Sequence, residues 1–301
     1  MFDTISIIGC GLIGSSILRA IKTKNLAKEI KVFDQSKEVI AYLKKENICI
    51  NPSNDINQCV INSDLIIIAT PLSSYKEIIL SIKDNLKKNV ILTDTGSVKK
   101  EVMKIIHNIN LTDVHWIPSH PIAGTEESGP KAGHAEMFEN RWCIISPPKN
   151  CSEQPVKSLK ALWETIGCKV KIMTPEEHDE ILSLTSHLPH AIAYNIVRTV
   201  ISVKDKLKQD VIQYSAGGLR DFTRIAASNP LMWRDIFLDN SENISKGIDS
   251  YIEKLNELKK ALNDKNGDKL YQIFNSTREV RKDIIKAGQD TSKPNFGRKK
   301  D

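Results

Sequence analysis

Short apolar runs alternate with helix-like segments from residue 4 to about residue 173. The runs are typical of strands buried on both faces of a parallel sheet, and they fall at 5–8, 30–33, 64–69, 90–94, 114–117, 142–146 and 169–173. A weaker strand is expected at 48–50. Segments with one apolar face predict the intervening helices, for instance at 36–45, 75–86 and 156–166. This order predicts an α/β domain with a doubly wound parallel sheet over residues 1–173.

The alternation stops at Thr174-Pro175-Glu176-Glu177, and everything beyond is expected to be helical. A threonine at the N-cap, a proline at the first helical position and a glutamate at the third mark a helix start. We therefore predict an all-α domain over 174–287 and a basic tail at 288–301. Its last two helices are expected at 241–263 and 268–287, and their apolar stripes predict a homodimer that forms through them.

Composition narrows the class of protein. The chain of 301 residues has room for two domains, and 40% hydrophobic with 27% charged residues describes a soluble globular protein. We expect no membrane span, no signal peptide and, from six cysteines without metal-ligand spacing, a reducing cytoplasmic location. The net charge of +6 comes without a basic stripe interleaved with aromatic residues. Nucleic acid is therefore not an expected partner, whereas an anionic small molecule is.

A glycine pattern follows the first predicted strand. Gly9-x-Gly11-x-x-Gly14 stands between a strand and a helix, as in the Rossmann-type dinucleotide-binding fold. Gly9 permits a tight turn, Gly11 lets a pyrophosphate approach the backbone, and Gly14 lets the helix pack closely. The loop, with Leu12 and Ile13, would offer backbone N–H groups to the phosphates. Alone, the pattern also fits an ordinary strand-to-helix turn.

Asp34 supports the dinucleotide interpretation. It ends the second apolar run about 20 residues beyond the last glycine, where an acidic residue binds the adenosine ribose hydroxyls. A carboxylate there repels the 2′-phosphate of NADP, so NAD is the expected cofactor. The alternative is an aspartate that caps the next helix. Thr70 and Pro71 end another strand at the carboxyl edge of the sheet, where ligands collect.

His120 is the main candidate for proton transfer. It stands between Pro118 and Pro121 in a segment that follows a strand, and histidine is suited to proton transfer near neutral pH. Ser97 lies after another strand, where its hydroxyl fits both a helix N-cap and a ligand contact. Both side chains are expected at the carboxyl edge of the sheet.

The helical half carries two polar stretches. Asp179, Ser183, Ser186 and His190 share one face of the helix that starts at Thr174, and Pro189 should interrupt that helix. His187 and His190 lack a third ligand at diagnostic spacing, so no metal is expected.

The second stretch opens a helix at 216–226. Asp221 and Arg224 share a face there, either as a surface ion pair or as part of a site.

Five motifs in order resemble the prephenate/arogenate (cyclohexadienyl) dehydrogenases of tyrosine biosynthesis over residues 4–285. They are the glycine loop, Asp94-Thr95-Gly96-Ser97-Val98-Lys99, Ser119-His120-Pro121-Ile122-Ala123-Gly124, Ser186-His187-Leu188-Pro189-His190 and Gly217 to Ala226. The resemblance implies oxidative decarboxylation of a cyclohexadienyl acid with hydride transfer to NAD. It also implies a helical dimerisation domain, and no fused mutase or regulatory domain is expected here.

The resemblance assigns roles residue by residue. His120 would accept the proton of the ring hydroxyl, with Ser97 assisting at the same oxygen. Arg224 would grip a substrate carboxylate. From its position one turn back on the same helix, and not from the resemblance, Asp221 is expected to hold that guanidinium. Ser186, His190 and Glu126 would line the substrate pocket.

Two alternatives remain open on the sequence. Another two-domain NAD(P)-dependent hydroxyacid dehydrogenase or reductase would join the same kinds of domain, but it would leave the His120 segment unexplained. A non-catalytic NAD-sensing module would need none of His120, Ser97 and Arg224. The choice between prephenate and arogenate stays open as well.

Overall fold

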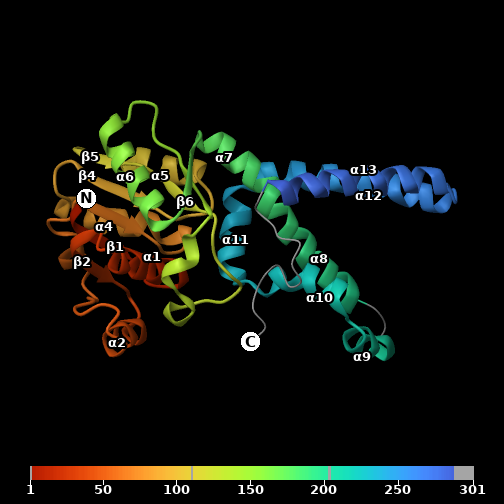
Figure 1. Cartoon of the computed structure of the whole chain (residues 1–301), viewed down its shortest axis with the longest axis horizontal. Helices are drawn as coiled ribbons and strands as arrows, with labels where there is room; N and C mark the ends of the chain where they lie inside the picture. The colour runs from red at the N-terminus through yellow and green to blue at the C-terminus, as the bar shows by residue number, and fades with distance from the viewer. Residues whose placement is uncertain (1, 110, 203–204, 288–301) are drawn as a thin grey trace. The chain divides into compact units, whose positions relative to one another are not determined.

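The computed structural model describes residues 2–109, 111–202 and 205–287 (Figure 1). It forms two compact units, Met1–Ile244 and Ser245–Asp301. The basic tail at 288–301 lies outside the described residues. The compact units divide after Ile244 and so do not test the domain boundary expected after residue 173, which stays a prediction.

A five-stranded parallel sheet forms the centre of the first unit. Its strands are β1 (Phe2–Ile8), β2 (Ala27–Phe33), β3 (Leu65–Ile68), β4 (Val90–Asp94) and β5 (Val114–Trp116), in the order β2-β1-β3-β4-β5. All four strand pairs are parallel. The strand order reverses at β1, which is where ligands bind in such sheets. The predicted fold class is confirmed.

Helices cover both faces of this sheet, as the near-continuous apolar strands require (Figure 1). On one face, α1 (Leu12–Thr23), α2 (Lys37–Lys45) and α6 (Glu153–Ile166) bury side chains such as Ile17 and Trp163. On the other, α4 (Tyr75–Ile82), α5 (Lys100–Ile109) and α11 (Pro230–Asp239) bury Ile79, Val102 and Ile236.

The last predicted strands form a separate small sheet. Here β6 (Ser119–Pro121) pairs antiparallel with β7 (Trp142–Ile145), which pairs parallel with β8 (Lys169–Ile172). Between β6 and β7 the chain makes only two short 3-10 turns, Pro130–Ala132 and Ala135–Phe138. A parallel return usually runs through a helix; the two turns supply none, and β7 comes back antiparallel. The segment at His120, expected as a loop, is thus a strand.

The weak strand expected at 48–50 is absent. The amides of Ile48 and Cys49 donate instead to the carbonyl of Leu43, at 3.0 and 3.3 Å, and so close the end of α2. An isolated bridge joins Phe33 to Ser53, and the short helix α3 (Ile56–Val60) follows, capped by Asp55.

The helix that starts at Thr174 is interrupted before Pro189, as predicted. The Thr174–Glu177 capping box opens α7 (Pro175–Leu182), a π-helix occupies Ser183–His187, and α8 (Leu188–Ile201) continues. Proline has no N–H to donate to the carbonyl four residues earlier, and wider π turns occur where that ladder is broken.

The last two helices agree closely with their predicted ranges. Before them, α9 (Asp205–Gln213) is followed by α10 (Gly217–Thr223), which ends in a 3-10 turn, Arg224–Ala227. Helices α12 (Ser241–Asn263) and α13 (Gly267–Lys286) then close the chain. Among the described residues, no helix is long and apolar enough to cross a membrane.

Candidate active site

The three glycines of the first loop have different physical reasons to be glycine. Gly9 has φ +88°, and a Cβ on it would lie 2.6 Å from Cγ2 of Thr70. A Cβ on Gly14 would lie 2.0 Å from the carbonyl oxygen of Gly9, so the helix could not pack there. A Cβ on Gly11 would meet nothing within 4 Å. Gly11 therefore leaves the approach to the helix start open for a ligand.

That helix start has the properties of a phosphate site. Gly11 is the N-cap of α1 and provides no side-chain cap, which leaves amides in the first turn, including those of Leu12 and Ile13, for an anionic ligand. Thr70 and Pro71 follow β3 beside Gly9, and the hydroxyl of Ser74 donates to that of Thr70 at 2.8 Å. The glycine loop and the end of β3 thus lie together at the carboxyl edge of the sheet.

Asp34 reaches this edge from β2. Its carboxylate accepts from the amide of Cys10 inside the glycine loop and from the amide of Ser36, both at 2.8 Å. It does not cap α2, because Ser36 is the N-cap and accepts from Val39. A carboxylate at the end of β2, tied to the loop, fits the ribose hydroxyls of a dinucleotide.

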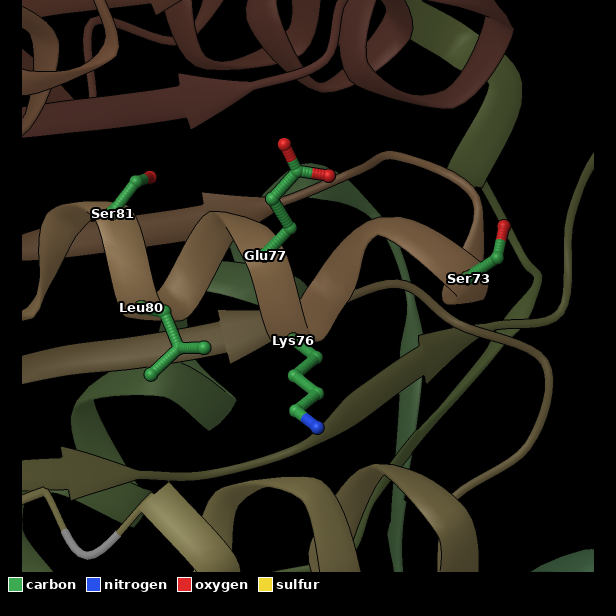
Figure 2. Close-up of a pocket in the computed structure, with 5 residues that line it drawn as sticks. All are labelled: Ser73, Lys76, Glu77, Leu80 and Ser81. Atoms are coloured by element: carbon green, nitrogen blue, oxygen red, sulfur yellow. The ribbon is translucent and has the colours of Figure 1, made fainter.

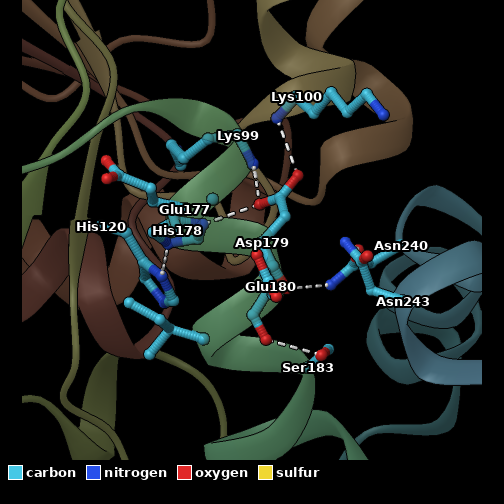
Figure 3. Close-up of polar contacts among 12 residues, drawn as sticks. Lys99, Lys100, His120, Glu177, His178, Asp179, Glu180, Ser183, Asn240 and Asn243 are labelled. Atoms are coloured by element: carbon cyan, nitrogen blue, oxygen red, sulfur yellow. Dashed lines mark hydrogen bonds and ion pairs between the residues drawn. The ribbon is translucent and has the colours of Figure 1, made fainter. Parts of the chain in front are cut away.

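His120 belongs to a hydrogen-bonded row of three side chains (Figure 3). Its Nδ1 lies 2.8 Å from Nε2 of His178, and Nδ1 of His178 lies 2.7 Å from Oδ1 of Asp179. Asp179 also accepts from the amides of Lys99 and Lys100, at 2.8 and 2.9 Å. All three side chains of the row are buried.

The carboxylate fixes the direction of this row. Asp179 only accepts, so His178 donates from Nδ1 and accepts at Nε2, and His120 donates from Nδ1. His120 is left with a lone pair on Nε2, which no hydrogen bond occupies within the described part of the chain. Burial, together with nearby His178 and Lys99, holds the pKa of His120 well below its usual value. The ring is therefore a neutral proton acceptor at pH 7.

A buried ion pair supports the strand that carries His120. The ammonium of Lys99 contacts Oδ2 of Asp94 and donates to the carbonyl of Ser119 at 2.9 Å, with both charged side chains fully buried. Asp94 also accepts from the hydroxyl of Tyr75 and the amide of Gly96. The pair thus connects the end of β4 to the residue that precedes His120.

Ser97 lies between the two members of this pair, in the loop that precedes α5. It is not the cap of that helix, which begins at Lys100; Asp179, from a distant part of the sequence, binds the first amides instead. The expectation of a local N-cap is wrong because a better acceptor comes from α7. The half-buried Ser97 side chain remains a candidate for ligand contact.

Arg224 pairs with Glu126 rather than with its neighbour on the helix. Its Nη1 donates to Oε2 of Glu126 at 2.6 Å, with both side chains about one-third exposed. Asp221 binds the exposed Arg220 at 3.0 Å. The prediction that Asp221 holds the guanidinium of Arg224 is therefore wrong, because Thr223 ends α10 and Arg224 turns towards Glu126.

His190 and Ser186 lie on the turn around Pro189. The ring of His190 stacks on Trp233, with centroids 3.6 Å apart, and its Nδ1 lies 2.8 Å from the carbonyl of Ser186. His190 is half-buried, and burial lowers its pKa. Within the described ranges, no group of three or more His, Cys, Asp or Glu side chains is placed to hold a metal ion.

Sequence patterns alone did not identify His178, Lys99, Asp94 or Trp233 as parts of the site. One signal was the adjacent His178-Asp179 pair on a helix with a polar face, and another was the motif whose first and last residues are Asp94 and Lys99. A separate hollow of about 560 Å³ lies along α4 and is lined by Ser73, Lys76, Glu77, Leu80 and Ser81 (Figure 2). None of the catalytic or cofactor candidates lines it.

A neutral imidazole near the carboxyl edge of a dinucleotide-binding sheet is the arrangement of an NAD-dependent dehydrogenase. The strand that carries it runs on towards the glycine loop, because a Cβ on Gly124 would lie 3.9 Å from Cδ1 of Ile13. Two family models match the chain: the nucleotide-binding domain of prephenate dehydrogenase at residues 17–172 and its dimerization domain at 174–276. The chain belongs to the prephenate dehydrogenase family.

Individual relatives agree with this assignment. The cyclohexadienyl dehydrogenase of Zymomonas mobilis is 38% identical over 93% of this chain and 96% of its own length. The prephenate dehydrogenase of Bacillus subtilis is 31% identical over 93% of this chain and 76% of its own. The crystal structure of prephenate dehydrogenase from Aquifex aeolicus with hydroxyphenyl propionate and NAD+ has a TM-score of 0.87 and 31% identity, and covers 94% of this chain and 99% of that one.

Proposed function

We propose that this chain catalyses the NAD-dependent oxidative decarboxylation of prephenate or arogenate, which yields 4-hydroxyphenylpyruvate or tyrosine. The observation that carries the proposal is the row His120–His178–Asp179, which leaves Nε2 of a neutral, buried imidazole free to accept a proton. Family membership and the NAD-bound structure of the A. aeolicus relative support the choice of substrate and cofactor.

Gly11, the first turn of α1 and Asp34 would hold the cofactor, at its pyrophosphate and its adenosine ribose. Bound NAD supplies the acceptor for the hydride that leaves the ring carbinol carbon. Thr70 and Pro71 would line the same edge beside Gly9. The hydrogen bond from Cys10 to Asp34 keeps the loop and the carboxylate together, so both would meet one ligand.

His120 would take the proton of the ring hydroxyl on Nε2 as that carbon becomes ketone-like, and loss of carbon dioxide then makes the ring aromatic. Positive charge on His120 is stabilised along the row, because His178 accepts from His120 and donates to the carboxylate of Asp179. General-base catalysis of this kind contributes about 10²–10⁴-fold. Ser97 would donate a hydrogen bond to the same substrate oxygen.

Arg224 would bind a carboxylate of the substrate. Its partner Glu126 accepts from Nη1 of the guanidinium, and a guanidinium has five N–H donors, so a second carboxylate can bind as well. Ser186 and His190 would line the pocket next to it, with His190 held flat against Trp233.

The proposed assembly is a homodimer through α12 and α13. Ile252, Leu255 and Phe274 are 49%, 44% and 57% exposed on these helices, and the dimerization-domain model matches residues 174–276. All six cysteines are free, and five of them are buried; this supports the reducing cytoplasm as the proposed location.

The test is formation of NADH with prephenate, and separately with arogenate, by the purified protein. Turnover of at least one of them is expected, with NADP much less effective because of Asp34. A small 2-hydroxy acid serves as the control substrate. The proposal fails if neither cyclohexadienyl acid is turned over, and the hydroxyacid-dehydrogenase alternative gains if the control substrate is.

A further inference from the structure

The amide of Asn240 has only one orientation that satisfies its neighbours. Its Nδ2 lies 2.8 Å from the carbonyl oxygen of Asp179 (Figure 3). The same nitrogen lies 3.1 Å from Nδ1 of His187, and Oδ1 of Asn240 accepts from Asn243 at 2.9 Å. A carbonyl only accepts, so the amide nitrogen must face Asp179. Because Asn240 is 4% exposed, water does not offer alternative partners.

This orientation fixes the tautomer of His187. Asn240 donates to Nδ1, so the neutral ring carries its hydrogen on Nε2. Burial lowers the pKa of His187 to about 4, which keeps the ring neutral at physiological pH. The charged and titratable groups around it are Asp179, which raises the pKa, and His178 and His190, which lower it; His120 is a further titratable neighbour.

The Nε2–H group of His187 is buried and has no hydrogen-bond partner among the described residues. A buried donor without a partner costs about 1–3 kcal/mol, so a ligand acceptor is the expected counterpart. A second donor of this kind is Nε of Arg224. Both donors lie near His190, because His190 lowers the pKa of His187 and Arg224 lowers the pKa of His190.

The local backbone explains how His187 comes to this position. It is the last residue of the π-helix, and π turns are frequent at functional sites. The wider turn buries His187 while His190, three residues on, stacks on Trp233. The His187 and Trp233 rings meet edge-on, with centroids 6.0 Å apart.

We propose that His187, held as the Nε2–H tautomer by Asn240, donates a hydrogen bond to a carboxylate oxygen of the substrate. This inference rests on the proposed function, since it assigns His187 to the same substrate site. Asn240 is a positioning residue, because it acts only through the imidazole. A neutral donor adds direction to substrate binding without a further buried cation in addition to Arg224.

The decisive variant is Asn240→Asp, which replaces the donor by an acceptor. Nδ1 of His187 must then carry the hydrogen, so Nε2 can no longer donate when the ring is neutral. KM for the preferred substrate is expected to rise at least about tenfold at pH 8, equivalent to about 1.4 kcal/mol. The new carboxylate also favours the charged ring, which donates from both nitrogens. KM should therefore fall back towards the wild-type value as the pH is lowered to 6.

Asn195→Asp is the matched control, because Asn195 lies exposed on α8 and its side chain binds neighbours on the same helix, donating to the carbonyl of Ala191 and accepting from Arg198. It introduces the same charge and should leave KM unchanged. If Asn240→Asp does not fold, His187→Gln and His187→Leu replace it. Glutamine keeps a donor and should retain KM within several-fold, whereas leucine should raise KM at least tenfold.

Three outcomes overturn the inference. One is a KM for Asn240→Asp that matches wild type or stays raised equally at pH 6 and pH 8. Another is equal KM for His187→Gln and His187→Leu, which would mean that Trp233 or a fixed water satisfies the donor. The third is a nitrogen-15 NMR spectrum of wild-type His187 with its hydrogen on Nδ1. Wild-type protein that turns over neither substrate would instead overturn the proposed function, and the NMR result would still decide the tautomer.

Discussion

The properties of His120, the proposed proton acceptor, depend largely on its neighbours in the fold. Its segment between two prolines is visible in the sequence, so the residue itself was predictable. Its partner His178 lies 58 positions away, and only the fold brings the two rings together. The same holds for Arg224, whose contact with Glu126 spans 98 positions. The spacing of three residues along the helix favoured Asp221 as the partner of Arg224, and that prediction was wrong.

His120→Asn should lower kcat about 10²–10⁴-fold while changing substrate and NAD affinity little. The reason is that proton acceptance matters most as the hydride leaves, so the interaction strengthens in the transition state. Steady-state rates with the preferred substrate give kcat, and fluorescence titration gives NAD affinity. His115→Asn, on β5, is the control and should retain turnover. A kcat of His120→Asn within a few-fold of wild type would contradict the mechanism.

Arg224→Ala should raise KM with kcat much less affected. Removal of the guanidinium leaves a substrate carboxylate and Glu126 without their cation, which costs about 2–5 kcal/mol. The matched control is Asp221→Ala, because that carboxylate pairs with the exposed Arg220. This variant should keep KM within twofold of wild type. Equal KM values for the two variants would remove Arg224 from the site.

Among the helices and strands, the sequence predicted those that depend on interactions between neighbouring residues. The start of α7 was predictable because Thr174, Pro175 and Glu177 are neighbours that satisfy one another. The small sheet was not, because the three residues of β6 have no apolar strand pattern, and β7 looks like any buried strand whose partner depends on the path of the chain. The N-terminus of α5 was missed for a similar reason, since its cap comes from α7.

The buried pair Lys99–Asp94 belongs to this scale, because it joins β4, α5 and β6. Lys99→Met should destabilise the protein by about 3–5 kcal/mol, since it leaves Asp94 buried and unpaired. The double variant Lys99→Met/Asp94→Asn should lose less, because no buried charge remains. Urea-unfolding midpoints measure both.

Lys157→Met is the control for this comparison. It breaks an exposed pair with Glu153, and such a loss should stay below about 1 kcal/mol. A Lys99→Met variant as stable as this control would show that Asp94 has another partner.

For the whole molecule, three buried histidines couple folding to pH. His120, His178 and His187 all have pKa values lowered chiefly by burial, His187 to about 4. The unfolded chain, with histidine pKa values near 6.5, then binds more protons below pH 6.5 than the folded chain does. Stability is therefore full above about pH 7 and falls as the pH drops from 6.5 towards 4.

His187 alone should account for about 3 kcal/mol of that loss. Unfolding free energies at pH 7.5, 6 and 5 test this, and His187→Gln should flatten the slope. His134→Gln is the control, because that side chain is half exposed. A wild-type stability that is flat between pH 5 and pH 7 would contradict the buried, neutral state of these rings.

The exposed apolar side chains of the second unit indicate a homodimer. Its two helices bury few of their own apolar side chains, and Tyr271 and Phe274 are 70% and 57% exposed. Light scattering at micromolar concentration should give twice the chain mass of 33.8 kDa. Phe274→Asp should shift the protein towards monomer, while Asn275→Asp, on the same helix, should not. A wild-type mass near one chain would rule out the proposed dimer at that concentration.

Asp179 binds the first amides of α5 with the same carboxylate that orients His178. One carboxylate thus caps a helix and orients the row that ends in His120. Natural selection therefore cannot change fold stability and proton transfer independently at this position. A substitution at Asp179 that lowers turnover should also lower the stability of the fold. Stabilising substitutions at other positions would then restore folding but not turnover. Efforts to engineer a more robust variant should therefore leave this position alone and look to the exposed faces of the helices.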